Sequence, residues 1–587
     1  MQRRHPDIRR DLIVLQITGH LFFLGLALIS VVFWKERQAF DAGHYLYELI
    51  DRKFFFIAHQ RPIGFVSQVL PVIGIWLKLP LSFVAILFSL GDILWYYLIF
   101  LLLAYGFESR KGIVSLLLIL SLTVRYSFFC PVTELLQAGA LLPVWMGLLD
   151  RTFRFRYVVL ILLAAVIIFS HPLLFYPLFF TLFWWSFQKS RPGLYPGNGR
   201  KYFITMLTMA LVAITVLKIL LLDKYDHDKT FYAIEYNDYG YLTTFRFPVF
   251  LHHAAVLAKG APVLAIIFLT AMGSLLWFRR WWQAGYLLAA ISGFLLIMSL
   301  THRFEELSNY FERMLLPVPM MMAIVSASVI TVTRTFIARL GAFVGLVLIL
   351  LMHFDVLRIS AQPFSARVDF ITELCQAAQS LIIRKAIASD DLLEQNSYAM
   401  TGWSFPIETL LISSYESREN SVTIALEKDQ IERNKKRGME AGAQDWIKWG
   451  ELIQDQSTLN ESYFRLPAGE YQPLLSSDTS YTGTVRLQLR QVRLQKPNVF
   501  LFDIGIQLSG NGILPNNGTT VLKLKSTSFP DLRSSVIPYR FRNNGFWSFS
   551  IPVSEIPDEP LLLELFAGSR KLGELPLRKS GQNITAE

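Results

Sequence analysis

The sequence predicts a polytopic α-helical membrane protein with about 11 transmembrane helices and a C-terminal extracytoplasmic α+β region that ends in a β-sandwich. Of its 587 residues, 53% are hydrophobic and only 17% are charged, whereas soluble globular proteins carry about 25% charged residues. Apolar runs of about 20 residues, the length that crosses a bilayer, recur along the first part of the chain. Further on, short stretches alternate between apolar and polar residues, which is typical of β-strands.

Each long apolar run is predicted to form one membrane span. The predicted spans are Leu12–Trp34, Ile86–Gly106, Ile113–Phe129, Pro131–Leu149, Tyr157–Ser170, Leu173–Phe187, Tyr202–Leu222, Pro262–Phe278, Ala284–Leu300, Leu315–Thr333 and Gly341–Phe354. The stretch Ile63–Pro80 is also apolar, but counting it as a span would place the later basic loops outside. We interpret it as a helix at the outer face of the membrane.

The positive charge of the chain has a topological explanation. From Ala361 onward there are 24 Lys+Arg and 26 Asp+Glu, a net of −2, so the first 360 residues hold the remaining 32 and 19, a net of +13. With the N-terminus inside, the inner connections hold 17 Lys+Arg and the outer connections hold 12. Basic residues gather in inner loops. We therefore expect a bacterial inner-membrane protein with a cytoplasmic N-terminus and a periplasmic C-terminal region, and no nucleic-acid partner.

Three domains are expected along the chain. Residues 1–360 form the transmembrane domain with its outer-face helices. Residues 361–475 are predicted to be mainly helical, because Asp369–Ala388 places apolar residues at helical spacing. Residues 476–587 are predicted to form a β-sandwich, since short alternating stretches are separated by Gly, Pro and Asn turns. Whether this last domain is a structural lid, a docking module or a carbohydrate-binding module stays open, because a sandwich fold does not fix function.

Ionisable side chains close to the span ends are the functional candidates, because charge near membrane depth is costly. These residues are Asp41, His44, His59, Arg61, Asp92, Arg125, Glu134, His171, Arg303, Glu305, Glu306, Glu312 and Arg313. Nearly all lie at the predicted outer face, which indicates a cavity that opens outward. Asp92 lies deeper and is interpreted as a buried acid bonded to a neighbouring helix. Arg125 has either a functional role or extends to the outer headgroups.

Cysteines and catalytic motifs exclude several classes of protein. Cys130 and Cys375 are the only two cysteines and form no CxxC pair, which excludes a disulfide scaffold and a zinc module. The chain has no P-loop, no GxSxG, no HExxH and no dinucleotide fingerprint. A transporter fits poorly, because no inverted repeat is evident.

Three segments carry a family resemblance. KERQAFDAGHYLYELI follows the first span and contains Asp41. HQRPIGFVSQVLPVIGIWLKLP begins with His59 and Arg61 and continues into an apolar helix. NYFERMLLPVPMMMAIV contains Tyr310 and Arg313 and leads into a late span. In their order and topological placement, these segments resemble the GT-C superfamily of polytopic membrane glycosyltransferases, which use lipid-phosphate-linked sugars. The similarity covers about the first 330 residues, patchily.

The resemblance implies a role for each matching residue. Transfer of a sugar from a lipid phosphate to a hydroxyl needs a base on the acceptor and positive charge on the leaving phosphate. Asp41 matches the catalytic acid of the family and is implied as the general base. The residues implied to bind substrate are His59, Arg61, Arg125, Arg303, Tyr310 and Arg313. Those implied to assist, or to hold a divalent metal ion, are His44, Glu134 and His171.

The sequence also departs from the family pattern. Asp41 is followed by Ala42 and Gly43 instead of a second acid, Arg61 is followed by a single proline, and no Asp-x-Asp occurs in a short outer loop. Metal dependence and catalysis itself therefore stay open. The structural alternatives are that Asp41 caps the helix that follows it and that the histidines form interfacial hydrogen bonds.

Two functions are compatible with these observations. The first is an inverting glycosyltransferase that moves a sugar from a polyprenyl-phosphate donor to a saccharide, lipid or protein acceptor on the outer face of the membrane. The second is a non-catalytic subunit with the same fold, bound to protein partners in a cell-envelope assembly or export complex. Membrane lipids surround the protein in either case.

Overall fold

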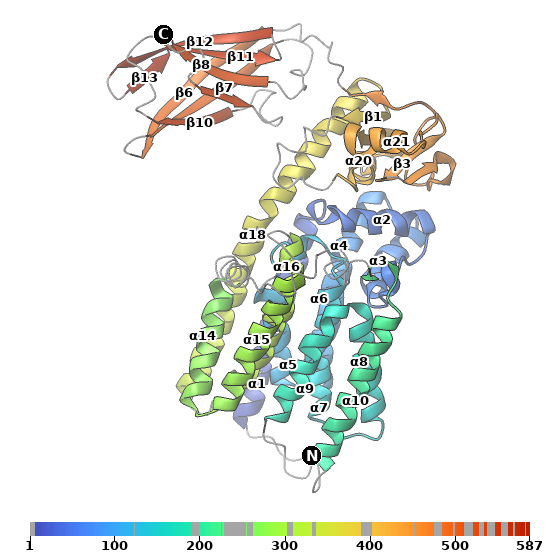
Figure 1. Ribbon diagram of the computed structural model, residues 1–587, viewed down its shortest axis with the longest axis vertical. Helices are drawn as coiled ribbons and strands as arrows, with labels where there is room; N and C mark the ends of the chain where they lie inside the picture. Colours follow the sequence, from blue (N-terminus) through green and yellow to red (C-terminus); the bar gives the residue numbers. More distant parts are fainter. Residues whose placement is uncertain are drawn as a thin grey trace. The chain divides into compact units, whose positions relative to one another are not determined.

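The computed structural model describes residues 6–122, 124–188, 199–224, 226–227, 254, 262–301, 309–331, 336–388, 402–450 and 452–474, together with strands between 484 and 586. The chain divides into two compact units, Met1–Phe364 and Ser365–Glu587. The first unit is a bundle of helices, and the second contains the sheets (Figure 1).

Among the described residues, six helices are long and apolar enough to cross a membrane. They are α1 (Pro6–Val32), α4 (Leu81–Leu101), α10 (Gly199–Leu220), α15 (Trp281–Thr301), α18 (Phe336–Ser380) and the segment Glu312–Ile330, which joins the end of α16 (Asn309–Leu315) to α17 (Pro317–Ile330). Each of them overlaps a predicted span. The chain therefore has the helices of a membrane protein, as the sequence predicts.

Shorter apolar helices lie at the other predicted spans. They are α5 (Arg110–Leu122), α6 (Glu134–Gly139), α7 (Leu142–Leu149), α8 (Arg156–Ser170), α9 (Phe175–Ser186) and α14 (Pro262–Trp277). The helices α5 and α17 pack against each other at the centre of the bundle. Residues 112–120 of α5 and 317–328 of α17 are all buried, which explains why both helices are apolar all round.

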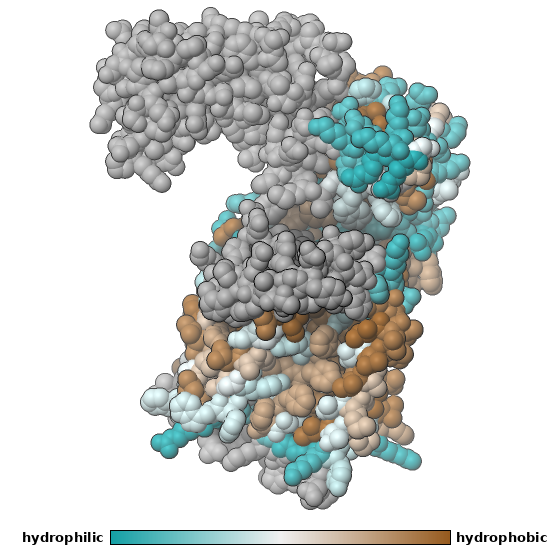
Figure 2. Space-filling view, viewed as in Figure 1, coloured by the Kyte–Doolittle hydropathy of each residue, from teal (hydrophilic) through white to brown (hydrophobic). Residues whose placement is uncertain are grey.

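The outer surface of the bundle carries a stripe of exposed apolar side chains. On α1, Ile17, Leu21, Leu24 and Leu28 are each more than half exposed, and their spacing of three or four residues places them on one helix face. Hydrophobic residues also make up much of the bundle surface that Figure 2 shows in colour, interspersed with paler ones. An apolar surface of this kind is expected where a helix faces lipid rather than water.

Two helices lie near the end of the bundle away from the N-terminus (Figure 1). They are α2 (Asp41–Arg52), which is strongly amphipathic, and α3 (Gly64–Trp76), which packs against α4. A Cβ on Gly91 of α4 would lie only 1.9 Å from the carbonyl oxygen of Ser67 in α3. This close approach requires glycine at that position.

The second unit begins with a small α/β arrangement, in which short strands that the sequence prediction does not include accompany the helices of residues 361–475. The strands β1 (Lys385–Ala388), β2 (Thr423–Leu426) and β5 (Gln472–Pro473) form a parallel sheet in the order β2-β1-β5, which packs with α20 (Phe405–Ser414). β3 (Asp445–Trp449) and β4 (Leu452–Asp455) form a hairpin. The predicted helix Asp369–Ala388 ends with α18 at Ser380, because Lys385–Ala388 pairs with β2.

The C-terminal strands form two antiparallel sheets, which Figure 1 shows in orange and red. One sheet has the order β10-β7-β6, with β6 (Thr484–Lys496), β7 (Val499–Ser509) and β10 (Phe546–Pro552). The other has the order β13-β12-β11-β8-β9, with β8 (Thr520–Ser526), β9 (Arg533–Val536), β11 (Leu561–Ala567), β12 (Arg570–Ser580) and β13 (Asn583–Ala586). β6 lies against β12 and β13 of the other sheet.

Candidate functional site

Asp41 is the first residue of α2, and its carboxylate is engaged by a residue from a distant part of the chain. The Arg313 Nη1 donates to Asp41 Oδ2 at 2.8 Å. Arg313 comes from α16 (Asn309–Leu315), 272 positions further along the chain. The helix N-cap is Phe40, which has no side-chain capping bond. The carboxylate of Asp41 therefore forms an ion pair and not the helix cap that was the structural alternative. With 43% of its side chain exposed, Asp41 is accessible to a ligand.

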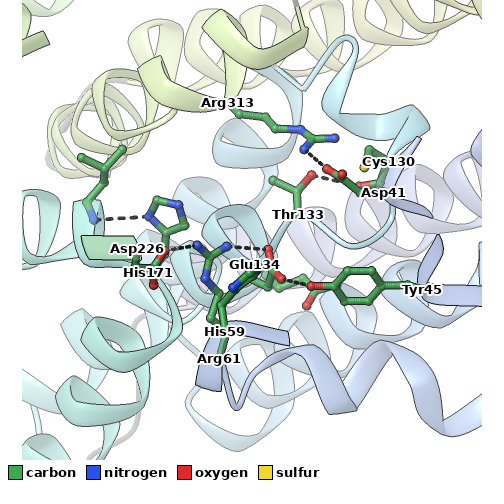
Figure 3. Close-up of polar contacts among 12 residues, drawn as sticks. Asp41, Tyr45, His59, Arg61, Cys130, Thr133, Glu134, His171, Asp226 and Arg313 are labelled. Atoms are coloured by element: carbon green, nitrogen blue, oxygen red, sulfur yellow. Dashed lines mark hydrogen bonds and ion pairs between the residues drawn. The ribbon is translucent and has the colours of Figure 1, made fainter. Parts of the chain in front are cut away.

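Arg61 lies at the centre of a second group of charges (Figure 3). Its Nη2 donates to Asp226 Oδ1 at 2.5 Å, and its Nη1 to Glu134 Oε2 at 3.3 Å. The other Glu134 oxygen accepts from the Tyr45 hydroxyl at 2.6 Å. Lys218 Nζ approaches Asp226 Oδ2 at 3.6 Å. This network joins α2, α6 and the end of α10 to the segment that precedes α3.

Two histidines flank these charges. His59 Nδ1 lies 3.0 Å from Asp223 Oδ2, and Asp223 also accepts from the backbone N–H of Asp226 at 2.7 Å. His171 Nδ1 accepts from the backbone N–H of Leu173 at 3.3 Å. Figure 3 shows His171 and His59 close to Arg61.

The backbone is strained next to both key residues. Phe40, His59 and Gln60 have φ angles of 57°, 52° and 55°, in the left-handed region that side chains with a Cβ rarely adopt. One of them immediately precedes Asp41 and two immediately precede Arg61. Such outliers gather at functional sites, where the surrounding structure holds them in place.

Burial and neighbouring charges shift the titration of the residues around the site. Burial lowers the pKa of His171 well below its usual value, and the cations Arg61, Lys218 and Arg313 lower it further. The imidazole is therefore neutral at neutral pH. Burial, together with the charge of Glu134 and the hydrogen bond to it, raises the pKa of Tyr45 well above its usual value. The phenol therefore remains a hydrogen-bond donor.

Cys130 belongs to the same environment. Burial raises the pKa of its thiol to about 11, although the positive charge of Arg313 opposes this shift and Asp41 and Glu134 reinforce it. The thiol is therefore protonated at neutral pH. The Thr133 hydroxyl donates to the carbonyl oxygen of Cys130 at 2.9 Å, which orders the turn between these two residues. Cys375 is likewise a buried free thiol.

The three residues considered for a divalent metal ion are held by other partners. His44 lies 4.0 Å from Glu48, one helical turn away, while Glu134 binds Tyr45 and Arg61. His171 lies near the cations Arg61, Lys218 and Arg313, whose positive charge opposes the binding of a metal ion. Among the described residues, no group of three or more His, Cys, Asp or Glu side chains is close enough to hold a metal ion.

Arg125 is separate from the two ion-pair groups. Its Nε donates to the Ser360 hydroxyl at 3.1 Å, and its guanidinium lies 4.8 Å from the centre of the Tyr126 ring. The adjacent Glu312 accepts from three backbone N–H groups, those of Arg125, Tyr126 and Ser127, at 2.9–3.0 Å. Glu312 therefore anchors this segment to α16, directly next to Arg313. Of the remaining predicted ligands, Arg303 lies outside the described residues, and Tyr310 is described only by its backbone position in α16.

The deeper acid, Asp92, has the structural partner that the sequence suggests. Arg37 Nη2 donates to Asp92 Oδ1 at 2.6 Å and to the Ser89 carbonyl at 3.0 Å. Arg37 Nη1 also donates to the Phe128 carbonyl, and the guanidinium lies 4.1 Å from the centre of the Phe128 ring. This pair ties η1 (Glu36–Gln38) to α4.

Four site residues were missed from the sequence: Tyr45, Lys218, Asp223 and Asp226. Lys218 had a detectable signal, because it is a lysine inside a predicted span. The two aspartates lie in an outer connection rich in Asp, Tyr and His, and nothing in its spacing distinguishes them. Tyr45 has no such signal, because a tyrosine on an amphipathic helix is as readily a packing residue as a hydrogen-bond donor.

The arrangement combines an accessible carboxylate with guanidinium groups and a neutral imidazole. A carboxylate can accept a proton from a hydroxyl, and guanidinium forks bind phosphate oxygens. The site therefore has the groups that proton transfer next to a phosphate requires. Comparison with known proteins adds no further constraint: no protein-family model, no curated protein and no solved structure matches the chain.

Proposed function

We propose that the protein is a membrane glycosyltransferase that transfers a sugar from a polyprenyl-phosphate-type donor to a hydroxyl acceptor on the outer face of the membrane, with inversion. The support combines the residues that resemble the GT-C superfamily with the geometry around Asp41. The lysine and arginine asymmetry of the connections supports a periplasmic location for this site and for the second unit.

The observation that carries the proposal is the ion pair between Asp41 and Arg313. These residues belong to two different segments of the family resemblance, and nothing in the sequence requires them to meet. Their side chains lie 2.8 Å apart. In an inverting transfer the acceptor oxygen attacks the anomeric carbon from the face opposite to the leaving phosphate. The reaction therefore needs a base and a phosphate-binding cation in one site, and Asp41 and Arg313 have to separate so that the reacting carbon lies between them.

The proposed step assigns each charge a role. The carboxylate of Asp41 accepts the proton of the acceptor hydroxyl while its oxygen forms a bond to the anomeric carbon. The bond from that carbon to the phosphate oxygen breaks, and the lipid phosphate leaves with the electron pair. Arg313 stabilises the growing negative charge on the phosphate. Arg61 is the next cation available to the phosphate, provided that one of its two carboxylate partners gives way.

A second candidate function follows from the pairing of the site charges. Asp41 is bound to Arg313, and Arg61 is bound to both Glu134 and Asp226. Charges held in ion pairs of this kind are also expected in a protein whose role is structural and not catalytic. This favours, as an alternative, a non-catalytic subunit of a cell-envelope assembly or export complex.

Analysis of the lipid and protein that copurify with the chain separates the two functions. The protein is extracted in mild detergent, and its bound lipid is identified by mass spectrometry. The glycosyltransferase is expected to retain a polyprenyl-phosphate species, and the Arg313→Ala variant is expected to lose it. Retention of a stoichiometric protein partner with no polyprenyl phosphate in the wild-type sample would favour the scaffold instead.

A further inference from the structure

A short turn between α14 and α15 combines exposed aromatic residues with two arginines. Trp277 and Trp282 are 84% and 87% exposed, and Phe278 and Trp281 are more than half exposed. Between them lie Arg279 and Arg280, for which the described residues offer no carboxylate partner within ion-pair distance. Figure 1 places this turn at the end of the bundle that also holds the start of α1.

The backbone of the turn is held in a fixed shape. Arg280 N–H donates to the Leu275 carbonyl at 2.8 Å, and Arg279 N–H donates to the Leu276 carbonyl at 3.0 Å. These two bonds form a Schellman motif, which ends α14 at Trp277. Its left-handed position is Arg279, with φ 55°.

Glycine is the usual residue at this position, because any side chain with a Cβ is disfavoured there. Arg279 therefore occupies the position against a local conformational preference. Its guanidinium also lies at the C-terminal end of α14, where the helix dipole favours a cation. The turn presents two adjacent cations in a fixed backbone, with large aromatic rings on both sides.

We propose that this turn is a binding site for the headgroup of an anionic glycerophospholipid. Tryptophan rings settle at the boundary between acyl chains and headgroups, and α15 is long and apolar enough to cross the membrane. The four rings therefore place the two arginines at the depth of the lipid phosphates. Within the described residues no carboxylate pairs with these arginines, so their charge is available to an anionic headgroup. Phosphatidylglycerol is the simplest lipid of this class.

Native mass spectrometry of the full-length protein in neutral detergent tests the site. The probes are phosphatidylglycerol and phosphatidylcholine with identical acyl chains. The wild-type protein is expected to prefer phosphatidylglycerol. Each arginine is expected to contribute about fivefold to that preference, from the strength of one basic residue near an anionic membrane surface. The double variant Arg279→Gln/Arg280→Gln is expected to lose most of it.

Two further variants separate charge from fold and from aromatic anchoring. Arg279→Gly removes one charge and relieves the left-handed position, so it is expected to lower the preference about fivefold without loss of thermal stability. Trp277→Ala/Trp282→Ala is expected to weaken both lipids equally. The control Lys435→Gln/Lys436→Gln removes the same charge from α21 (Arg433–Lys436) and is expected to change nothing.

Three outcomes would overturn the proposal. The first is an unchanged preference in the double arginine variant. The second is an equal loss in the lysine control, which would make the effect one of net charge. The third is the release of a bound protein, instead of lipid, when the arginines are replaced.

Discussion

Arg313 forms one ion pair at the candidate site and keeps a further guanidinium donor unused. Its Nη1 binds Asp41, and its Nε has no hydrogen-bond partner among the described residues. A buried guanidinium N–H without a partner is costly, so a phosphate oxygen that accepts from it stabilises the complex. The Nε of Arg61 also has no hydrogen-bond partner among the described residues, but Arg61 is bound to two carboxylates and Arg313 to one. Arg313 is therefore the better placed of the two for an anionic ligand.

Arg313→Ala is predicted to weaken binding of a polyprenyl phosphate by about 1–3 kcal/mol, the strength of one charge-assisted contact. Arg313→Lys is expected to recover only part of the loss, because an ammonium lacks the planar fork. A binding titration in detergent measures both. Arg358→Ala serves as a control, since Arg358 is exposed and, in the described part of the chain, forms its ion pair with the nearby Asp355. Equal affinity in Arg313→Ala and the control would assign the phosphate to another residue.

We predict that the titration of His171 makes the free energy of unfolding depend on pH. Its pKa in the folded protein lies well below the usual value of 6.5, so the unfolded chain binds a proton more readily than the native one. Stability is therefore expected to fall as the pH decreases below about 6.5. His171→Asn keeps an acceptor for the Leu173 N–H and removes the titration. Thermal unfolding between about pH 5 and pH 8 is expected to give a flatter profile for the variant than for the wild type, and identical profiles would contradict the prediction.

The sequence shows which residues could bind substrate or transfer a proton, but it does not show which of them form ion pairs or hydrogen bonds with one another. The cost of charge near membrane depth marks out Asp41, Arg61, Glu134, His171 and Arg313 as candidates. Their partners depend on how helices far apart in the chain pack together, and no spacing encodes that. Arg125 illustrates the limit, because its charge and depth match those of Arg313 while its Nε binds Ser360.

At the scale of elements, the Arg37–Asp92 pair is expected to hold η1 against α4. Removing one partner leaves a buried charge, so Arg37→Met is predicted to cost about 3–5 kcal/mol. The double variant Arg37→Met/Asp92→Leu is expected to be considerably more stable than the single one, since no unpaired charge remains. Thermal unfolding in detergent compares them. A double variant as unstable as Arg37→Met would show that packing, not charge, dominates at this position.

The apolar runs of the sequence predict where several helices lie, but they do not predict where each helix ends. Apolar runs locate α1, α4, α10 and α15 because lipid and core both demand apolar side chains. The helix α18 extends to Ser380, past the predicted span end at Phe354 and through Pro363. Hydropathy cannot show this, because the helix continues after its apolar part stops. Lys385–Ala388 forms a strand because β2 pairs with it, a tertiary effect that overrides the local helical pattern.

At the scale of the whole molecule, the N-terminus is predicted to be cytoplasmic and the second unit periplasmic. A cysteine at Lys435, an exposed residue of the second unit, is expected to react with an impermeant reagent added to intact cells. A cysteine at Arg154, an exposed residue between α7 and α8, is expected to stay protected. The native Cys130 and Cys375 are buried and give little background. Labelling at Arg154 from outside would contradict the orientation.

The measurement that tests the central claim most directly compares donor binding and sugar transfer in the Asp41→Asn variant. Asparagine keeps the size of the side chain and removes its basicity. The matched control is Asp51→Asn, the same substitution on the same helix. We predict a folded Asp41→Asn protein that still binds polyprenyl-phosphate sugar and transfers it about 10²–10⁴-fold more slowly, the contribution of a general base. Transfer at the wild-type rate by Asp41→Asn would contradict the account.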